Sequence, residues 1–530
     1  MGHPLQPAAA GRRRPAHRRR HGPRAGRARI RHRSRPGPAR RVRGAATVTD
    51  PIVNDILSAA TAVRVTGRTA GGPRLAVLDP STGEPFTEVS TGNGADAAAA
   101  LGRARQALPG WAGTPRAVRS AALRAIAADV EALAAEPEWP ALITRESGKR
   151  LAESVAELGL TVAYFRIMAD LLDRQETEQL SVVPGITHRV TTRPVGVAAV
   201  LTPWNFPVSI PARKIAPALA AGCPVLFKPS ELTPLSSMVL AAVVERHVPA
   251  GVLSTVLGTP ADVVDPWLAD QSVGVVSFTG STRVGRLVAA ATAPRFVRTV
   301  MELGGCAPFL VLPDADPQAA AQTLLVAKYR NNGQSCIAAN QILVAREVAA
   351  EFTEAFIAAT EKMVAGLPTD PATDLGPLAP ASDPARMASL VEEAVSKGAR
   401  KVTSGAVPEK GHFAPATVLL DAPVDSRVMT DEIFGPIAPI HVYDDLDDAL
   451  ALHHATGYGL AGYVCSADLD RAHAVADRLS AGIVGINTGT PNTPWIPFGG
   501  VQDSGLGYEG GRPGLEAFQT FLSIGSKAQV

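Results

Sequence analysis

The stretch Val195-Gly196-Val197-Ala198-Ala199-Val200-Leu201, followed by Thr202 and Pro203-Trp204-Asn205-Phe206-Pro207, decides the fold class of this chain. The apolar run predicts a strand, and the two prolines bound a turn that begins where this strand ends. Open α/β sheets bind ligands beyond the carboxyl ends of their strands. The Asn205 amide is therefore either a donor in a ligand site or an ordinary capping asparagine in a Pro-bounded turn.

After this turn, strand-like and helix-like segments alternate with turn residues between them. The predicted elements are a helix ending at Gly222, the strand Pro224–Phe227, a helix after Thr233-Pro234, the strands Ser254–Val256 and Val273–Phe278, and a helix after Ser281. A second alternating region runs from Pro308 to about Val484. This alternation predicts an α/β fold with parallel sheets covered by helices, in a Rossmann-like layer arrangement.

The residues before the opening stretch predict helices and a hairpin. Ala- and Leu-rich segments predict helices over Asp96–Leu108, Pro115–Leu133 and Leu151–Leu172. Apolar and β-branched residues alternate over Ser181–Val200 around Pro184-Gly185, a pattern typical of a β-hairpin.

Size and composition indicate a multidomain protein. The 530 residues are 46% hydrophobic, which is enough for two or more cores. No apolar run reaches membrane-spanning length, so we expect a soluble chain with no membrane partner. The four cysteines form no CxxC pair and no Cys/His ligand spacing. This argues against a disulfide framework or a metal site, and it favours the reducing cytoplasm.

The first 49 residues differ from the rest in charge. They hold 15 of the 52 basic residues, all arginine, and no acidic residue, which leaves 37 basic against 49 acidic side chains and a net charge of −12 elsewhere. This Arg-, Pro- and Gly-rich tail has no apolar periodicity and is predicted to be disordered. It is either a translated upstream extension, with the true start near Val48, or a segment that binds nucleic acid or an anionic surface. We favour the extension and expect no nucleic-acid partner.

Two further strand ends carry groups suited to a dinucleotide. Lys228-Pro229-Ser230-Glu231 offers a cation for a phosphate and a carboxylate for ribose hydroxyls. Thr233 is predicted to cap the helix that follows. Gly280 permits close backbone approach, and Ser281 can cap a helix whose N-terminus favours phosphate.

Two residues are suited to covalent catalysis. Glu302 ends an apolar segment before Gly304-Gly305, and burial there would raise its pKa, as a general base requires. The alternative is a strand-end glutamate that faces solvent. Cys336 ends the polar loop from Arg330 and is placed to be reached by a substrate, although a buried structural cysteine is the commoner case. Cys306 is explained more simply as a packed small residue.

Together these segments resemble the aldehyde dehydrogenase superfamily from about residue 50 to 525. The matches are collinear with the family's order, which argues against chance agreement. They are Pro203–Pro207, Lys228–Glu231, Phe278–Gly285, Glu302–Gly305, Gly333–Cys336, Glu432–Pro436 and Phe498–Gly507.

The resemblance implies oxidation of an aldehyde to a free acid with NAD or NADP. It assigns Cys336 as the nucleophile, Asn205 as an oxyanion donor and Glu302 as the base that activates water. The positions that resemble the family's cofactor site are Trp204, Asn205, Lys228, Pro229, Ser230, Glu231, Gly280, Ser281, Glu432 and Phe434. A carboxylate at Glu231 accepts hydrogen bonds from a 2′-hydroxyl and repels a 2′-phosphate, so NAD is favoured over NADP.

The resemblance also bears on the substrate. Arg213 and Arg330 match arginines that bind the distal carboxylate in succinate-semialdehyde dehydrogenases, and two guanidiniums suit such an anion. Thr493 is a candidate to supply a hydroxyl to the same group. Succinate semialdehyde is the predicted substrate. Glutarate semialdehyde, a sulfonated aldehyde and a non-acidic aldehyde remain alternatives, as does an ordinary structural role for both arginines.

The implied architecture has three parts. Residues 50–180 and 196–300 form an NAD(P)-binding domain, 301–484 a catalytic domain, and 181–195 with 508–530 a small β oligomerisation unit. An exposed hairpin edge is a liability unless it pairs with another subunit. We therefore expect a homodimer or a homotetramer.

Overall fold

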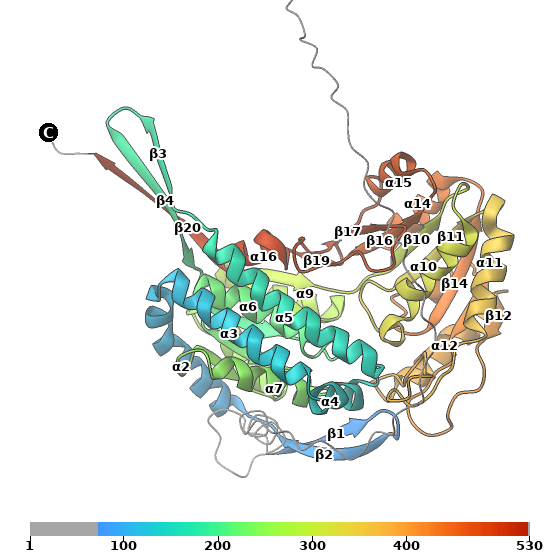
Figure 1. The fold of residues 1–530 in the computed structure, drawn as a ribbon, viewed down its shortest axis with the longest axis horizontal. Helices are drawn as coiled ribbons and strands as arrows, with labels where there is room; N and C mark the ends of the chain where they lie inside the picture. Colours follow the sequence, from blue (N-terminus) through green and yellow to red (C-terminus); the bar gives the residue numbers. More distant parts are fainter. Residues whose placement is uncertain (1–72, 528–530) are drawn as a thin grey trace, which may run out of the picture. The chain divides into compact units, whose positions relative to one another are not determined.

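The computed structural model describes residues 73–527, which belong to the compact unit Val48–Val530. Residues 1–72 and 528–530 are outside the described part. The prediction of disorder for residues 1–49 therefore concerns residues that the structure does not describe. Figure 1 shows helices packed around the sheets of this unit, with a narrow arm of β-strands extending from it.

The described chain begins with a β-hairpin and four helices. Strands β1 (Arg74–Asp79) and β2 (Glu84–Ser90) pair antiparallel, and the helices are α2 (Gly94–Gly113), α3 (Arg116–Ala134), α4 (Glu138–Ser147) and α5 (Leu151–Asp173). The three predicted helices are confirmed as α2, α3 and α5, while α4 is an element that the sequence pattern did not predict.

A six-stranded sheet contains the opening stretch, β5 (Val197–Leu201), near its middle. Its order is β19-β9-β8-β5-β6-β7, and all neighbours are parallel except β19 and β9. The other strands are β6 (Val225–Lys228), β7 (Leu253–Thr255), β8 (Val273–Thr279), β9 (Arg298–Glu302) and β19 (Gly505–Leu506). The predicted parallel sheet is confirmed.

Helices cover both faces of this sheet because alternate residues of each strand point to opposite sides. Ala198 and Val200 pack with α3, α5, α6 (Ser209–Ala221) and α7 (Pro234–Glu245). Val197, Ala199 and Leu201 pack with α2, α8 (Pro260–Ala269) and α9 (Thr282–Thr292), and the short η1 (Ala293–Arg295) follows α9.

The parallel register aligns the strand ends that carry polar residues. Leu201 pairs with Lys228 on one side and with Phe278 on the other, and Thr279 pairs with Glu302. The segments after β5, β6, β8 and β9 therefore meet along one edge of the sheet, as the motif positions predicted.

A seven-stranded sheet follows, in the order β12-β13-β14-β11-β10-β16-β17, with only β12 and β13 antiparallel. Its strands are β10 (Ala307–Val311), β11 (Ala339–Ala345), β12 (Arg400–Thr403), β13 (Thr417–Leu420), β14 (Ile437–Tyr443), β16 (Ala461–Cys465) and β17 (Ile483–Ile486). One face packs on α10 (Pro317–Tyr329) and α11 (Arg346–Thr360). The other packs on α12 (Asp383–Ser396), α13 (Arg427–Thr430), α14 (Leu446–His454) and α15 (Leu469–Ala476).

The arm in Figure 1 is an antiparallel sheet of β3 (Glu178–Val183), β4 (Ile186–Pro194) and β20 (Gln519–Lys527). The predicted hairpin is confirmed, and Gly185 takes the left-handed turn position with φ 76°. The segment before β20 holds α16 (Gly511–Glu516), and a minor pair joins β15 (Tyr458–Gly459) to β18 (Val501–Gln502).

One predicted helix cap is confirmed in position but not in its hydrogen bond. Thr233 is the N-cap residue of α7 and Pro234 begins the helix, but the Thr233 side chain makes no capping bond and donates to the backbone oxygen of Trp204 at 3.0 Å. The buried Glu146 carboxylate caps the helix instead, accepting from the backbone N–H groups of Leu235 (3.0 Å) and Ser236 (2.8 Å). Glu146 lies far from α7 in sequence, so local capping rules could not identify it.

Candidate active site

The loop before Cys336 has an unusual backbone. It begins as the short η2 (Arg330–Gly333), in which Asn331 (φ 54°), Asn332 (φ 58°) and Gly333 (φ 74°) are all left-handed. Such conformations are unfavourable for residues with a Cβ, although asparagine tolerates them better than most. A Cβ at Gly333 would lie 2.3 Å from the Gly435 oxygen, so this position requires glycine.

Side-chain amides hold this loop in place. Asn332 donates to the backbone oxygens of Gly148 (3.2 Å) and Pro377 (3.0 Å) and accepts from the Gly376 N–H at 2.8 Å. The Gln334 side chain accepts from the Ala379 N–H at 3.0 Å. These bonds offset the backbone strain and fix the position from which Cys336 extends.

Cys336 is the partly exposed cysteine, whereas Cys223, Cys306 and Cys465 are buried. Burial of its thiol, with the nearby Glu432 and Glu302 carboxylates, raises the pKa of Cys336 to about 12, and Arg213 opposes this shift. The thiol is therefore largely protonated at neutral pH and must lose its proton before it acts as a nucleophile. Cys306 is 1% exposed, which confirms it as a packed small residue.

Asn205 lies against the cysteine loop. It is 3% exposed, and its Nδ2 donates to the backbone oxygen of Gln334 at 3.1 Å. An amide nitrogen has a second N–H, so Asn205 keeps a donor for a ligand. The structure thus brings together the turn after β5 and the Cys336 loop, which are separated by more than a hundred residues in sequence.

Glu302 ends β9 and is 1% exposed. Neither carboxylate oxygen has a hydrogen-bond partner among residues 73–527. Burial, followed by the nearby Glu509 carboxylate, raises the pKa of Glu302 well above its ordinary value, while Arg213 and Lys214 oppose the shift. The buried environment expected for a general base is present, and the alternative of a solvent-facing glutamate is wrong.

Glu509 and Lys214 are buried charged residues that sequence reasoning missed. Glu509 forms an ion pair with Lys214, and its other oxygen lies 2.6 Å from Nε of Arg213. Glu509 also accepts from the Ser277 hydroxyl at 3.1 Å. These contacts, Lys214 foremost, hold the pKa of Glu509 below its ordinary value despite burial. The available signal was a glutamate in a glycine-dense segment without an evident role.

The three predicted substrate residues differ in placement. Arg213 and Arg330 both line the cavity at Cys336, together with Phe206 and Phe498. Arg213 lies 4.0 Å from the Phe498 ring centroid and is already paired with Glu509. Thr493 is exposed and is not among the residues that line this cavity, whereas its neighbour Asn492 is.

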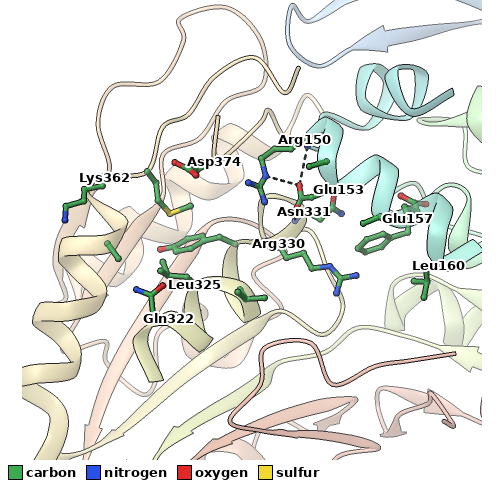
Figure 2. Close-up of a pocket in the computed structure, with 17 residues that line it drawn as sticks. Arg150, Glu153, Glu157, Leu160, Gln322, Leu325, Arg330, Asn331, Lys362 and Asp374 are labelled. Atoms are coloured by element: carbon green, nitrogen blue, oxygen red, sulfur yellow. Dashed lines mark hydrogen bonds and ion pairs between the residues drawn. The ribbon is translucent and has the colours of Figure 1, made fainter. Parts of the chain in front are cut away.

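Arg330 has no carboxylate partner among the described residues. Its guanidinium lies 5.5 Å from the centroid of the Phe206 ring. Together with Phe206 and Leu160 it lines both the cavity at Cys336 and a larger neighbouring cavity of about 740 Å³. Figure 2 shows the Arg330 side chain extending into this larger cavity, on the side where Leu160 lies. The Arg330 guanidinium thus lies between the cavity at Cys336 and the larger cavity.

Eight of the predicted cofactor residues, all except Glu432 and Phe434, end or follow the aligned strands β5, β6 and β8. Lys228 pairs with Glu231 at 2.6 Å after β6, beside Pro229 and Ser230. Ser281, next to Gly280, caps α9 by accepting from the Val284 N–H at 3.4 Å, as predicted. The exposed N–H groups of this helix start suit a phosphate.

Glu432 lies near Cys336, and Trp204 and Phe434 form an aromatic pair. Burial raises the pKa of Glu432 to about 7, and one of its oxygens accepts from the Gly305 N–H at 3.1 Å. The rings of Trp204 and Phe434 meet edge to face with centroids 5.4 Å apart. A Cβ on Gly304 would come within 2.7 Å of the second Glu432 oxygen, so the glycine keeps that side of the carboxylate open. A dinucleotide fits this set of groups: the N-terminus of α9, the Lys228 ammonium, the Glu231 and Glu432 carboxylates, and the Trp204 and Phe434 rings.

Residues 73–527 lack two kinds of feature. These residues contain no cluster of His, Cys, Asp and Glu that could hold a metal ion. No helix in the same part of the chain is long and apolar enough to cross a membrane.

Comparison with known proteins gives consistent matches. The model of the aldehyde dehydrogenase family matches residues 68–524. A succinate-semialdehyde dehydrogenase of Paenarthrobacter nicotinovorans is 41% identical over 81% of this chain and 96% of its own length. A glutarate-semialdehyde dehydrogenase of Pseudomonas putida is 37% identical over 84% of this chain and 93% of its own. The crystal structure of a succinate-semialdehyde dehydrogenase from Burkholderia pseudomallei superposes with a TM-score of 0.85 at 35% identity, covering 91% of this chain and 100% of that one.

Proposed function

Since the chain belongs to the aldehyde dehydrogenase family and is an NAD(P)-dependent aldehyde oxidoreductase, we propose that it oxidises succinate semialdehyde to succinate. The observation that supports this substrate is the position of Arg330. Its cation lies in the wall of the cavity at Cys336 and has no carboxylate partner among the described residues. A substrate with a remote carboxylate would supply the missing anion.

The residues support a two-stage reaction on Cys336. The deprotonated sulfur attacks the aldehyde carbon to form a thiohemiacetal, and the Asn205 amide with the Cys336 N–H stabilises the oxygen anion. When bound, the nicotinamide cofactor accepts the hydride that leaves this carbon. The carbon is then held as a thioester on Cys336.

Glu302 completes the reaction in this proposal. Its carboxylate takes a proton from water, and the water oxygen attacks the thioester carbon. The C–S bond then breaks, and the leaving sulfur takes the proton back from Glu302, which releases the acid and regenerates the thiol. The raised pKa of Glu302 suits this role because the carboxylate becomes a stronger base.

Two other anionic substrates remain candidates. Glutarate semialdehyde is one carbon longer, and the P. putida relative bears its name. A sulfonated aldehyde would present the same kind of anion to Arg330. The cavity beyond Arg330, of about 740 Å³, leaves room for a longer or bulkier substrate.

For the cofactor we propose NAD, with NADP as the alternative. Glu231 follows β6, at a position that resembles the family's cofactor site, and a carboxylate there would repel a 2′-phosphate. Its ion pair with Lys228, at 2.6 Å, weakens this argument because Lys228 partly neutralises the carboxylate. Measuring kcat/KM with both cofactors decides between them.

The deciding experiment is a substrate panel with the purified enzyme. Succinate semialdehyde, glutarate semialdehyde, a sulfonated aldehyde and an uncharged aliphatic aldehyde are compared with NAD and with NADP. We expect the highest kcat/KM with succinate semialdehyde and NAD. Equal kcat/KM for the uncharged aldehyde and for succinate semialdehyde would contradict the proposed substrate. If neither NAD nor NADP were reduced with any of these aldehydes, the proposed activity would be contradicted.

We also propose the three-part division predicted above and a homodimer or homotetramer assembled through the arm. The strand β3 is exposed along its whole length, and Val182 (76% exposed) and Phe521 (70%) leave apolar surface on the arm. Such an edge favours pairing with a second copy. Light scattering of wild type and of a chain lacking the arm hairpin tests this.

A cytoplasmic location is part of the proposal, in line with four cysteines that are all free thiols. The competing hypothesis, nucleic-acid binding by the Arg-rich tail, is tested by mass spectrometry of the native N-terminus. A mature chain beginning near Val48 would exclude it.

A further inference from the structure

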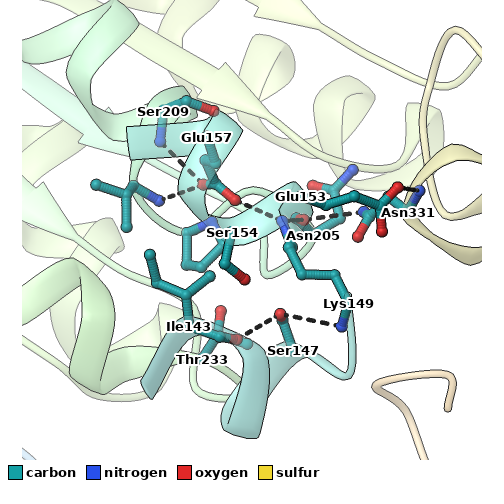
Figure 3. Close-up of polar contacts among 12 residues, drawn as sticks. Ile143, Ser147, Lys149, Glu153, Ser154, Glu157, Asn205, Ser209, Thr233 and Asn331 are labelled. Carbon is teal, nitrogen blue, oxygen red and sulfur yellow. Dashed lines mark hydrogen bonds and ion pairs between the residues drawn. The ribbon is translucent and has the colours of Figure 1, made fainter. Parts of the chain in front are cut away.

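Lys149 is a buried lysine to which the proposed mechanism assigns no role, and it contacts the backbone of Asn205. It stands between α4 and α5 and is 0% exposed. Its ammonium group is 2.5 Å from a Glu157 oxygen and 2.8 Å from the backbone oxygen of Asn205. The same group lies 4.2 Å from the centroid of the Phe206 ring. Figure 3 shows Lys149, Glu157 and Asn205 within one polar network.

Glu157 ties this network to the start of α6. Its second oxygen accepts from the backbone N–H groups of Val208 (2.8 Å) and Ser209 (3.1 Å). The ion pair therefore binds the backbone on both sides of Phe206: Lys149 binds the Asn205 carbonyl, and Glu157 binds the N–H groups of Val208 and Ser209. An ion pair that served only to neutralise two buried charges would need no contact with the backbone of Asn205.

Asn331 anchors the same carbonyl from the opposite loop. Its Nδ2 donates to the backbone oxygens of Asn205 and of Gln334, both at 3.0 Å. The Asn205 side chain also donates to Gln334. The backbone of Asn205 is thus fixed by two donors, while its side chain faces the segment that carries Cys336.

We propose that Lys149 is a positioning residue which, together with Asn331, fixes the Asn205 carbonyl and so aims the Asn205 amide at the oxyanion. Lys149 does not touch the substrate and acts through Asn205. The inference rests on the proposed function because it requires Asn205 to be the oxyanion donor. A displacement of about 1 Å at such a donor can cost roughly a hundredfold in rate.

The test must separate positioning from stability, because removing one partner of a buried ion pair is strongly destabilising. The variant is therefore Lys149→Met combined with Glu157→Gln. Glu157→Gln alone is the matched control: it leaves the buried Lys149 without its carboxylate, so its cost is expected in thermal stability, while Lys149 can still donate to the Asn205 carbonyl. The glutamine keeps an oxygen for the N–H groups of Val208 and Ser209. Both are made in wild type and in an Asn205→Ala background, and kcat/KM with succinate semialdehyde, NAD affinity and thermal unfolding are measured.

We expect a loss below about threefold for Glu157→Gln and about ten- to a hundredfold for the double variant, with NAD affinity unchanged. In the Asn205→Ala background the double variant should lose less than about threefold, since residues acting through one another are not additive. Equal losses in both backgrounds, or no loss, would overturn the positioning role.

Two controls keep the outcome decisive. If Asn205→Ala alone leaves kcat/KM unchanged, the proposed oxyanion role fails, and the failure lies with the proposed function. If the double variant does not fold, Asn331→Gly removes the second anchor while glycine accommodates the φ of 54°. Its loss should likewise disappear in the Asn205→Ala background, and an undiminished loss there overturns the inference.

Discussion

Replacing Glu302 by glutamine should slow turnover without weakening the fold. The side chain is 1% exposed, and its carboxylate oxygens have no hydrogen-bond partner among residues 73–527, so glutamine loses no protein contact there. It cannot take a proton from water, and losing a general base typically costs about 10²- to 10⁴-fold. The loss falls on thioester hydrolysis, while attack by Cys336 and hydride transfer continue.

The assay is rapid mixing of enzyme, NAD and succinate semialdehyde. We expect a burst of about one NADH per subunit followed by slow turnover, because the thioester accumulates when its hydrolysis limits the rate. Cys336→Ser is the control and should show no burst. Unchanged turnover of the Glu302→Gln variant, or slow turnover without a burst, would refute the assignment of Glu302 to hydrolysis.

Stability measurements on the same variant give an independent check with a defined sign. Burial and Glu509 raise the pKa of Glu302 above its ordinary value of 4.5, so the folded state holds this proton more tightly than the unfolded state. This contribution is fully present below about pH 4.5 and is lost as the pH rises through the raised pKa. Glu302→Gln should therefore gain stability over wild type as the pH increases. A constant difference between pH 4 and pH 9 would contradict the pKa shift.

Three further predictions follow from the site. Arg330→Ala should lower kcat/KM for succinate semialdehyde by about 30- to 5,000-fold, the usual 2–5 kcal/mol for a charge left without its partner, and should change kcat/KM for an uncharged aldehyde little; equal losses would contradict the anion site. Glu509→Gln should lower the free energy of unfolding by about 3–5 kcal/mol in urea titrations, because Arg213 and Lys214 lose the carboxylate between them; unaltered stability would contradict that role. Alkylation of Cys336 by iodoacetamide, measured against Cys336→Ser, should accelerate with pH beyond pH 9 because its pKa is raised to about 12; a plateau near pH 8 would disagree.

The periodic parts of the fold and the strand-end residues were accessible from sequence. The apolar run Val197–Leu201 and its successors predicted a parallel sheet, and the parallel register then brings their carboxyl ends together. Glu302 could be proposed as a buried base because it ends an apolar segment, and its burial is what the structure shows. These inferences depend on short-range patterns.

The buried polar contacts were not accessible in the same way. Glu509 meets Lys214 across 295 positions, and Asn331 meets the Asn205 carbonyl across 126. No local pattern encodes such a pair, because each charge gains its partner only when the chain folds. Helix α4 was missed for a related reason: its Pro-bounded start has no side-chain cap, and Glu146 within it serves the distant helix α7.

The amide of Asn332 has a consequence for how this enzyme fails and how it can change. One side chain joins the loop Arg330–Cys336 to Gly148, Gly376 and Pro377, so the backbone strain of this loop is shared with the turn before α5 and with the segment before α12. We expect heat to abolish activity before it melts the helices, because loosening any of these segments releases the loop. We expect substitutions at Leu160, Phe206 or Phe498, which line the cavity at Cys336, to change the substrate range, because the loop itself tolerates few substitutions.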